Sequence, residues 1–179
     1  MKDNKDDILW GAFWGTIFFI IAFTAALFVI KPFDGQVAQQ AIVFPNQILD
    51  MKQVDIISGD EAKKSVNGLH GLDIPLKNAY IARYQGANNA SAIVWVSESF
   101  NKEDATKLFK VMDEKMPKSS SFSNYERVKY KEFDLRYVYW PKMNMHDVYY
   151  LSGNNNYWLA VSVDKDMKAF LDETLPQFK

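Results

Sequence analysis

An uncharged apolar run near the N-terminus constrains this chain more than any other feature. Residues 8–30 read ILWGAFWGTIFFIIAFTAALFVI, which is 23 residues without a charge. As a helix that rises about 1.5 Å per residue, the run reaches roughly 34 Å, enough to cross a hydrocarbon core of about 30 Å. Lys31 follows it, and Pro32 cannot continue a helix. The sequence therefore predicts a transmembrane helix over residues 8–30, preceded by a short tail of residues 1–7.

The same run could instead be the apolar part of a cleaved secretory signal. That part is usually about 7–15 residues long and ends at a cleavage site made of small residues. The run here is longer, and its best candidate site, Thr24-Ala25-Ala26, lies inside it. We therefore favour a retained anchor.

The lysines that flank the run predict its orientation. Lys2 and Lys5 lie before it, whereas only Lys31 lies within about twenty residues after it. Cytoplasmic flanks carry the excess of lysine and arginine, and acidic residues count little in this rule. The tail is then cytoplasmic. The chain is expected to be a single-pass protein of the cell membrane, with its C-terminal domain in the periplasm or outside the cell.

Small residues form a stripe along the predicted helix. Gly11 and Gly15 are four residues apart, and the same spacing recurs at Ala22 and Ala26. Eleven residues at about 100° each return to within about 20° of the starting direction, so the two pairs share one side. Small residues let helices approach closely in lipid. We expect another transmembrane helix as a partner, from a second copy or from another subunit of a complex.

The remainder of the chain has the composition of one folded domain. About 145 residues follow Pro32, and the chain is 48% hydrophobic and 15% aromatic. Residues 1–35 hold three of the 21 basic and four of the 22 acidic residues, which leaves 18 of each. A neutral domain lacks the basic field that nucleic acid requires, so we expect no nucleic-acid partner. Cysteine is absent, which removes disulfides and thiolate chemistry.

Periodicity and turn signals predict an α+β fold after a connector of residues 31–57. The soluble domain, residues 58–179, opens with a helix at about 59–67, for which Ser58 and Glu61 form a capping box. Further helices are expected at about 102–116, capped by Asn101, and after Asp164; strands are expected at 78–85, 91–97, 125–131, 135–140, 147–152 and 157–163. These elements make a mostly antiparallel sheet of about six strands with two to three packed helices. This order resembles the layered sheets of the photosystem-accessory-protein class.

Both faces of the predicted sheet are apolar. In its second strand, one face carries Ala92, Val94 and Val96, and the other carries Ile93 and Trp95. Two interpretations remain open. Either helices cover both faces, or the aromatic face is an exposed groove for a ligand or a protein partner.

The residue sets that usually carry catalysis are missing. No nucleophile elbow, phosphate loop, zinc-protease motif or dinucleotide fingerprint is present. The two histidines are His70, which lies near Asp73, and His146, which precedes Asp147. Each carboxylate could orient an imidazole, but no set with a nucleophile forms. We therefore expect a protein that is not an enzyme.

One short segment carries metal-binding chemistry. Residues 140–146 read WPKMNMH, which places two thioethers, an imidazole and an indole within seven residues: Trp140, Met143, Met145 and His146. Thioether and imidazole ligands suit Cu(I), and an indole face can cover a bound cation. The simpler interpretation is a hairpin turn in which methionine side chains fill a gap in the core.

The spacing W-P-x-M-x-M in this segment resembles the copper-site segment of the small periplasmic copper(I)/silver(I) chaperones of efflux systems. The resemblance implies that Trp140 caps the metal and that Met143 and Met145 bind it. The family's histidine ligand lies on an earlier strand, and Glu132 stands eight residues before Trp140 here, so His146 would have to replace it. The family is a small β-barrel, whereas the elements above predict an α+β domain.

Two functions follow from the sequence. The first is a membrane-anchored extracytoplasmic domain without catalytic activity or cofactor, which acts as an accessory, assembly or binding subunit of a membrane complex. The alternative is an extracytoplasmic Cu(I) carrier or sensor that uses Trp140, Met143, Met145 and His146. A hydrolase or transferase would be a third class, for which the sequence offers no residue set.

Overall fold

The computed structural model describes residues 42–70 and 73–178, which fall within one compact unit, Ala41–Lys179. The predicted tail, residues 1–7, and the predicted transmembrane helix, residues 8–30, lie outside the described residues. So does the small-residue stripe, which comprises Gly11, Gly15, Ala22 and Ala26. Within the described part, no helix is both long enough and apolar enough to cross a membrane.

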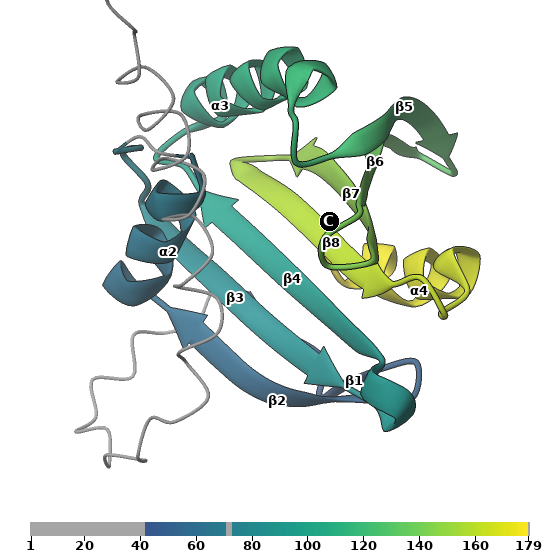
Figure 1. Cartoon of the computed structure of the whole chain (residues 1–179). Helices are drawn as coiled ribbons and strands as arrows, with labels where there is room; N and C mark the ends of the chain where they lie inside the picture. Colours follow the sequence, from purple (N-terminus) through teal and green to yellow (C-terminus); the bar gives the residue numbers. More distant parts are fainter. Residues whose placement is uncertain (1–41, 71–72, 179) are drawn as a thin grey trace, which may run out of the picture. The chain divides into compact units, whose positions relative to one another are not determined.

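Eight antiparallel strands among the described residues form one sheet (Figure 1). Their order is β1-β2-β3-β4-β8-β7-β6-β5, so each half is a meander and β4 meets β8 in the middle. The strands are β1 (Gln47–Ile48), β2 (Met51–Ser58), β3 (Asn78–Gln85), β4 (Ser91–Glu98), β5 (Ser123–Tyr130), β6 (Phe133–Trp140), β7 (Met145–Ser152) and β8 (Asn155–Ser162). The expected sheet of about six strands is therefore wrong, because two more strands precede the first one predicted.

The two additional strands, β1 and β2, come from residues that we expected to belong to the connector. The sequence of β2 does not alternate regularly because the strand bulges at Val54, where the register with β3 shifts between Gln53 and Asp55. The bulge breaks the period-two alternation on which the prediction of strands rests. In addition, Val54 and Ile56 are exposed although they are apolar, so the strand shows no clear buried side in its sequence.

Helices cover both faces of the sheet (Figure 1). α2 (Asp60–His70) and α3 (Lys102–Lys115) pack on one side, which we call the α2/α3 face, and α4 (Met167–Thr174) packs on the other, the α4 face. Short 3₁₀ turns lie at Ala87–Asn89, Met116–Lys118 and Leu175–Gln177.

This packing confirms the alternation predicted for β4. Ala92, Val94 and Val96 lie in the core beneath α4, whereas Ile93 and Trp95 pack against the core beneath α2. Of the two interpretations offered by the sequence, coverage of both faces by helices is the one that the structure shows. The aromatic side chains of the sheet belong mainly to its core.

The helix starts agree with the sequence in one case and differ in another. The Asn101 side chain accepts a hydrogen bond from the Asp104 N–H at 2.9 Å, which confirms the predicted cap of α3. The cap of α4 is Asp166, which accepts from the Ala169 N–H at 3.0 Å. Asp164, the predicted cap, instead lies in the turn after β8.

The first helix also differs from its prediction. Ser58, expected to cap the helix, is the last residue of β2. Gly59 follows with φ of +70°, a backbone conformation that glycine adopts without strain, and α2 begins at Asp60. α2 then continues to His70, past Gly68, because a single glycine within a helix is tolerated at a cost of about 1 kcal/mol.

Candidate functional site: the β6–β7 turn and the buried carboxyl of Asp147

The turn between β6 and β7 holds the residues predicted to bind Cu(I). Trp140 ends β6 and Met145 begins β7, and the two are cross-strand partners. The turn between them closes through a hydrogen bond of 3.3 Å from the Asn144 N–H to the Pro141 carbonyl oxygen. Met143, within this turn, is 42% exposed, whereas Met145 is 1% exposed. One thioether therefore meets solvent and the other belongs to the core.

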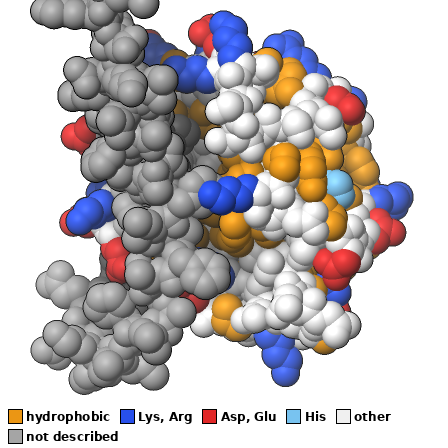
Figure 2. Space-filling model, viewed as in Figure 1, with side chains coloured by type: hydrophobic (Ala, Val, Ile, Leu, Met, Phe, Trp, Pro, Cys, Tyr) orange, Lys and Arg blue, Asp and Glu red, His pale blue; other side chains and the backbone are white. Residues whose placement is uncertain are grey.

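His146 lies on the opposite side of the sheet from Met145. Successive side chains of a strand alternate, so Met145 joins Trp140 on the α2/α3 face and His146 points to the α4 face. The His146 Nδ1 atom is 2.8 Å from the Tyr137 hydroxyl oxygen, and the His146 and Tyr139 ring centroids are 5.8 Å apart. Figure 2 shows imidazole atoms at the surface, bordered by apolar side chains. The structure brings Trp140 and Met145 together and separates His146 from them.

Asp147, which the sequence suggested only as a partner for His146, is the most unusual polar group of this region. It follows His146 and therefore points to the α2/α3 face, where it is completely buried. Its Oδ1 atom accepts a hydrogen bond of 2.8 Å from Trp158 Nε1, and its Oδ2 atom has no hydrogen-bond partner among the residues that the structure describes. Burial raises the pKa of Asp147 from 3.8 to about 7, an effect that the hydrogen bond from Trp158 only partly offsets.

A strand pattern could have found this group. Asp147 occupies the same face of β7 as Met145 and Tyr149, both of which are buried. A carboxylate at such a position interrupts an apolar row and is therefore a signal for a buried acid. Because the Asp147 side chain is enclosed, it can take up or release a proton only when the surrounding packing opens.

Aromatic rings surround the site on the α2/α3 face. The Phe122 ring lies 5.3 Å from that of Trp140 and 5.4 Å from that of Trp158, measured between centroids. Trp158 in turn stacks on Tyr149, with centroids 5.0 Å apart and planes 8° apart, and Phe109 of α3 lies 5.8 Å from Tyr149. This row of rings joins α3 to the sheet, and it supplies the apolar surroundings that disfavour an ionised Asp147.

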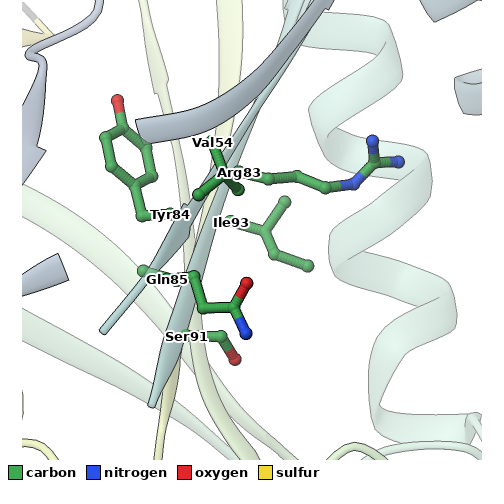
Figure 3. A pocket seen from close by; sticks show the side chains of 7 residues that line it. Val54, Arg83, Tyr84, Gln85, Ser91 and Ile93 are labelled. Carbon is green, nitrogen blue, oxygen red and sulfur yellow. The ribbon is translucent and has the colours of Figure 1, made fainter. Parts of the chain in front are cut away.

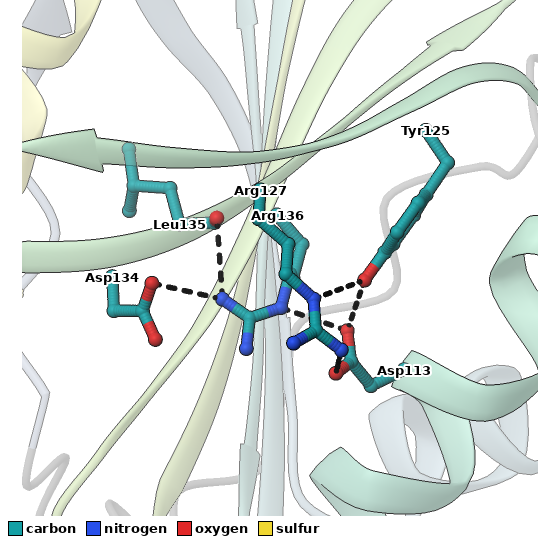
Figure 4. A network of polar contacts seen from close by, with 6 residues as sticks. All are labelled: Asp113, Tyr125, Arg127, Asp134, Leu135 and Arg136. Atoms are coloured by element: carbon teal, nitrogen blue, oxygen red, sulfur yellow. Dashed lines mark hydrogen bonds and ion pairs between the residues drawn. The ribbon is translucent and has the colours of Figure 1, made fainter.

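A charged network fastens α3 to the outer strands (Figure 4). One Asp113 carboxylate oxygen accepts hydrogen bonds from the Tyr125 hydroxyl at 2.6 Å and from Arg136 Nε at 2.8 Å; the other accepts from Arg127 Nη2 at 2.9 Å. Arg136 Nη1 also pairs with Asp134 at 3.1 Å. The charged groups of the network thus satisfy one another.

The charges around Asp113 keep its carboxylate ionised, as in an ion pair that stabilises the fold. Burial alone would raise the pKa of Asp113, but the hydrogen bonds from Tyr125 and Arg136 and the charges of both arginines lower it below its ordinary value. The Arg136 guanidinium also lies 5.2 Å from the ring centroid of Phe109, in reach of a cation–π contact. Asp113 is therefore held ionised by its partners, and the network stabilises the position of α3.

A pocket lies beside the bulge of β2 (Figure 3). Its lining is Val54, Arg83, Tyr84, Gln85, Ser91, Ala92 and Ile93. Figure 3 shows the side chains of Arg83 and Tyr84 leaving β3 on opposite sides. The one charged group of the lining, Arg83, is bound to the Asp55 carboxylate, so the pocket offers mainly apolar contacts.

Metal-binding groups of the usual kinds do not gather in the described domain. Across residues 42–70 and 73–178, no three side chains of the types His, Cys, Asp and Glu are grouped as a metal ion requires. The predicted Cu(I) site relies on thioethers, which this statement does not cover, and it stays a prediction.

Comparison with known proteins gives no relative on which to base a function. No family model matches this chain, and neither a curated protein nor a solved structure resembles it significantly.

Proposed function

We propose that this chain is a single-pass, membrane-anchored extracytoplasmic protein without catalytic activity, which acts as an accessory, assembly or binding subunit of a membrane complex. The observation that carries the proposal is the uncharged run of 23 residues at 8–30, which is followed by one compact unit, Ala41–Lys179. An apolar run of that length suits a membrane span.

The character of the domain supports this function. It has a core on each face of its sheet, and its formal charge is zero. Its most elaborate charged network, centred on Asp113, satisfies itself internally and holds α3 in place. Such a domain is suited to contacts with proteins, since it carries no strong field for nucleic acid or anionic lipid.

The proposed partner in the membrane is another helix, from a second copy or from a different subunit. The support for it is the small-residue stripe of Gly11, Gly15, Ala22 and Ala26. The lysines at positions 2 and 5 support a cytoplasmic N-terminus and a domain in the periplasm or outside the cell.

Extraction of membranes tests the anchor. The full-length chain is expected to stay in the membrane pellet after alkaline carbonate treatment and to enter solution only with detergent. Recovery in the carbonate supernatant would refute the anchor. A chain that lacks residues 1–35 is the matched control, and it is expected in the soluble fraction.

Purification in mild detergent tests the complex. The tagged chain is expected to bring down a stoichiometric membrane partner, or a second copy carrying a different tag. Leucine at both Gly11 and Gly15 is expected to weaken this association, because bulk prevents close approach of the helices. Leucine at both Phe13 and Thr24, which lie on the side of the helix opposite the stripe, is the control and should leave it intact. A strictly monomeric chain would contradict the proposal.

Handling of Cu(I) is the second candidate function, and it is favoured by one observation. Trp140 and Met145 are cross-strand partners beside the turn that carries Met143, so an indole and two thioethers come from one hairpin end. Anaerobic titration with Cu(I), in competition with a chelator, is expected to quench tryptophan fluorescence at one-to-one stoichiometry.

The variant that tests this site replaces both methionines with leucine, which preserves apolar volume. Met143→Leu with Met145→Leu is expected to abolish Cu(I) binding, whereas Met112→Leu on α3 should not affect it. Unchanged binding after the double substitution would exclude these thioethers as ligands.

A further inference from the structure

The two outer edges of the sheet are protected to different degrees. β5, at one edge, places the charged side chains of Glu126, Arg127 and Lys129 in solvent. Near the other edge, β2 exposes Val54 by 59% and Ile56 by 39%. Soluble proteins usually block an open strand edge with charge, proline or a covering segment, because an open edge pairs readily with another strand. The β5 edge has three such charges, whereas the described β2 residues 54–58 carry one charge, Asp55, and a bulge at Val54.

The open part of β2 is five residues long. The two-residue strand β1 pairs only with Met51 and Lys52, and the Asn46 carbonyl oxygen accepts a hydrogen bond of 2.9 Å from the Gln53 N–H. At the other end, Gly59 turns the chain away into α2. Residues 54–58 remain between these limits, and no other described strand pairs with their outer side.

The hydrogen-bond phase of β2 shows which backbone groups point outward. Gly59 donates its N–H to the Ala79 carbonyl oxygen of the neighbouring chain segment at 3.1 Å. In an antiparallel pair, bonded and non-bonded positions alternate, so Ile57 also faces β3. Ile56 and Ser58 therefore direct their N–H and C=O groups to the open edge, where a further strand would receive them.

We propose that the β2 edges of two copies of this chain pair antiparallel about a two-fold axis at Ile56, which joins the two sheets into one. The open stretch is centred on Ile56, so this axis uses its whole length. Ile56 then lies opposite its own counterpart, and Val54 lies opposite the second copy's Ser58.

Charge and symmetry favour a second copy in this register. With the axis at Ile56, Asp55 lies opposite the second copy's Ile57, whereas an axis one residue earlier would oppose two Asp55 carboxylates. Like charges directly opposite one another destabilise an antiparallel pair. A two-fold axis also closes the assembly, since each copy pairs through the same open stretch of β2. The pairing involves only the described domain and does not depend on the membrane anchor.

Cysteine cross-linking in the full-length chain tests this pairing directly, because the natural sequence contains no cysteine. Opposed residues at a bonded position have Cα atoms about 5.5 Å apart, within the range of about 4.4–6.8 Å that a disulfide spans. Under mild oxidation, Ile56→Cys is expected to give a covalent dimer. Lys129→Cys, on the protected β5 edge, is the matched control and should stay monomeric.

The register is tested with two differently tagged chains. A mixture of Val54→Cys and Ser58→Cys chains is expected to cross-link between the two tags, with at least tenfold less product within either tag alone. Ile56→Lys is expected to reduce the dimer, measured by native mass spectrometry, at least tenfold without changing the circular dichroism of the domain.

Three results would overturn the pairing. They are no dimer from Ile56→Cys in a folded chain, equal cross-linking at Lys129→Cys, and attachment of a different protein at position 56. A carbonate-soluble chain that still cross-links through position 56 would refute the anchor and leave this interface intact. A membrane-bound chain that does not cross-link would support the anchor and refute this interface.

Discussion

Replacement of Asp147 by asparagine tests whether this carboxyl holds its proton in the folded protein. In the unfolded chain the carboxyl ionises near its ordinary pKa of 3.8, whereas burial raises the pKa in the folded state to about 7. Below pH 3.8 both states bind the proton. Between these two values only the folded state does, so the free energy of unfolding falls as the pH rises, and it is level again above about pH 7.

The size of the fall follows from the two pKa values. The two pKa values differ by about three, and a pKa difference of one corresponds to about 1.4 kcal/mol. Ionisation of Asp147 therefore lowers the free energy of unfolding by about 4 kcal/mol between pH 4 and pH 8. Asparagine does not titrate and still accepts from Trp158, but its NH2 group has two donors without a partner where the protonated carboxyl has one, at an added cost of about 1–3 kcal/mol. The variant is therefore expected to be less stable than the natural protein at pH 4 and more stable at pH 8.

Urea unfolding of a fragment that begins at residue 36, followed by tryptophan fluorescence from pH 4 to pH 8, measures this crossover. Asp164→Asn, at an exposed site, is the control and should follow the natural protein at every pH. If the curves for Asp147→Asn and the natural protein run parallel across this range, the buried carboxyl does not titrate as described and the reasoning is wrong.

Four further substitutions test the packing of the domain by the same unfolding measurement. Asp113→Ala is expected to destabilise the fold by about 3 kcal/mol, because it leaves the guanidinium of Arg136 buried without its main partner; a loss below 1 kcal/mol would contradict this role. Asp55→Ala, which removes a half-exposed ion pair, is expected to cost less than about 1 kcal/mol. Asn101→Ala removes the cap of α3 and is expected to cost about 1 kcal/mol, so an unchanged midpoint would refute the cap. Phe170→Ala removes a fully buried ring of α4 and is expected to cost about 3–5 kcal/mol, and a smaller effect would mean that the surrounding core collapses around the gap.

The sequence predicted the centre of the fold better than its edge. β4 was assigned correctly together with its two faces, because Ala92, Val94 and Val96 alternate regularly with Ile93 and Trp95. Central strands bury both faces, so their side chains keep a strict pattern. β2 was missed because an edge strand has fewer neighbours, and its bulge shifts the alternation within a few residues.

The candidate site shows what spacing alone can and cannot predict. Met143 and Met145 are predicted to bind one ion because they are close in sequence, but Met143 lies in the turn, where no strand periodicity applies, and Met145 is buried in β7. His146 was grouped with Met145 by proximity in sequence, although neighbours on a strand point to opposite faces. Asp147 is buried against Trp158 of β8, which itself packs on Phe122 from the loop before β5, so no local pattern could give its pKa.

Labelling of single cysteines with a membrane-impermeant maleimide tests whether the domain is anchored outside the cytoplasm. The labelling is done on cells whose outer layers are removed and whose cytoplasmic membrane is sealed. With Lys129→Cys in the domain and Asn4→Cys in the tail, we expect labelling of position 129 before permeabilisation and of position 4 only afterwards. The reverse order would contradict the proposed orientation. Protection of both positions until the membrane is opened would contradict an anchored extracytoplasmic domain altogether.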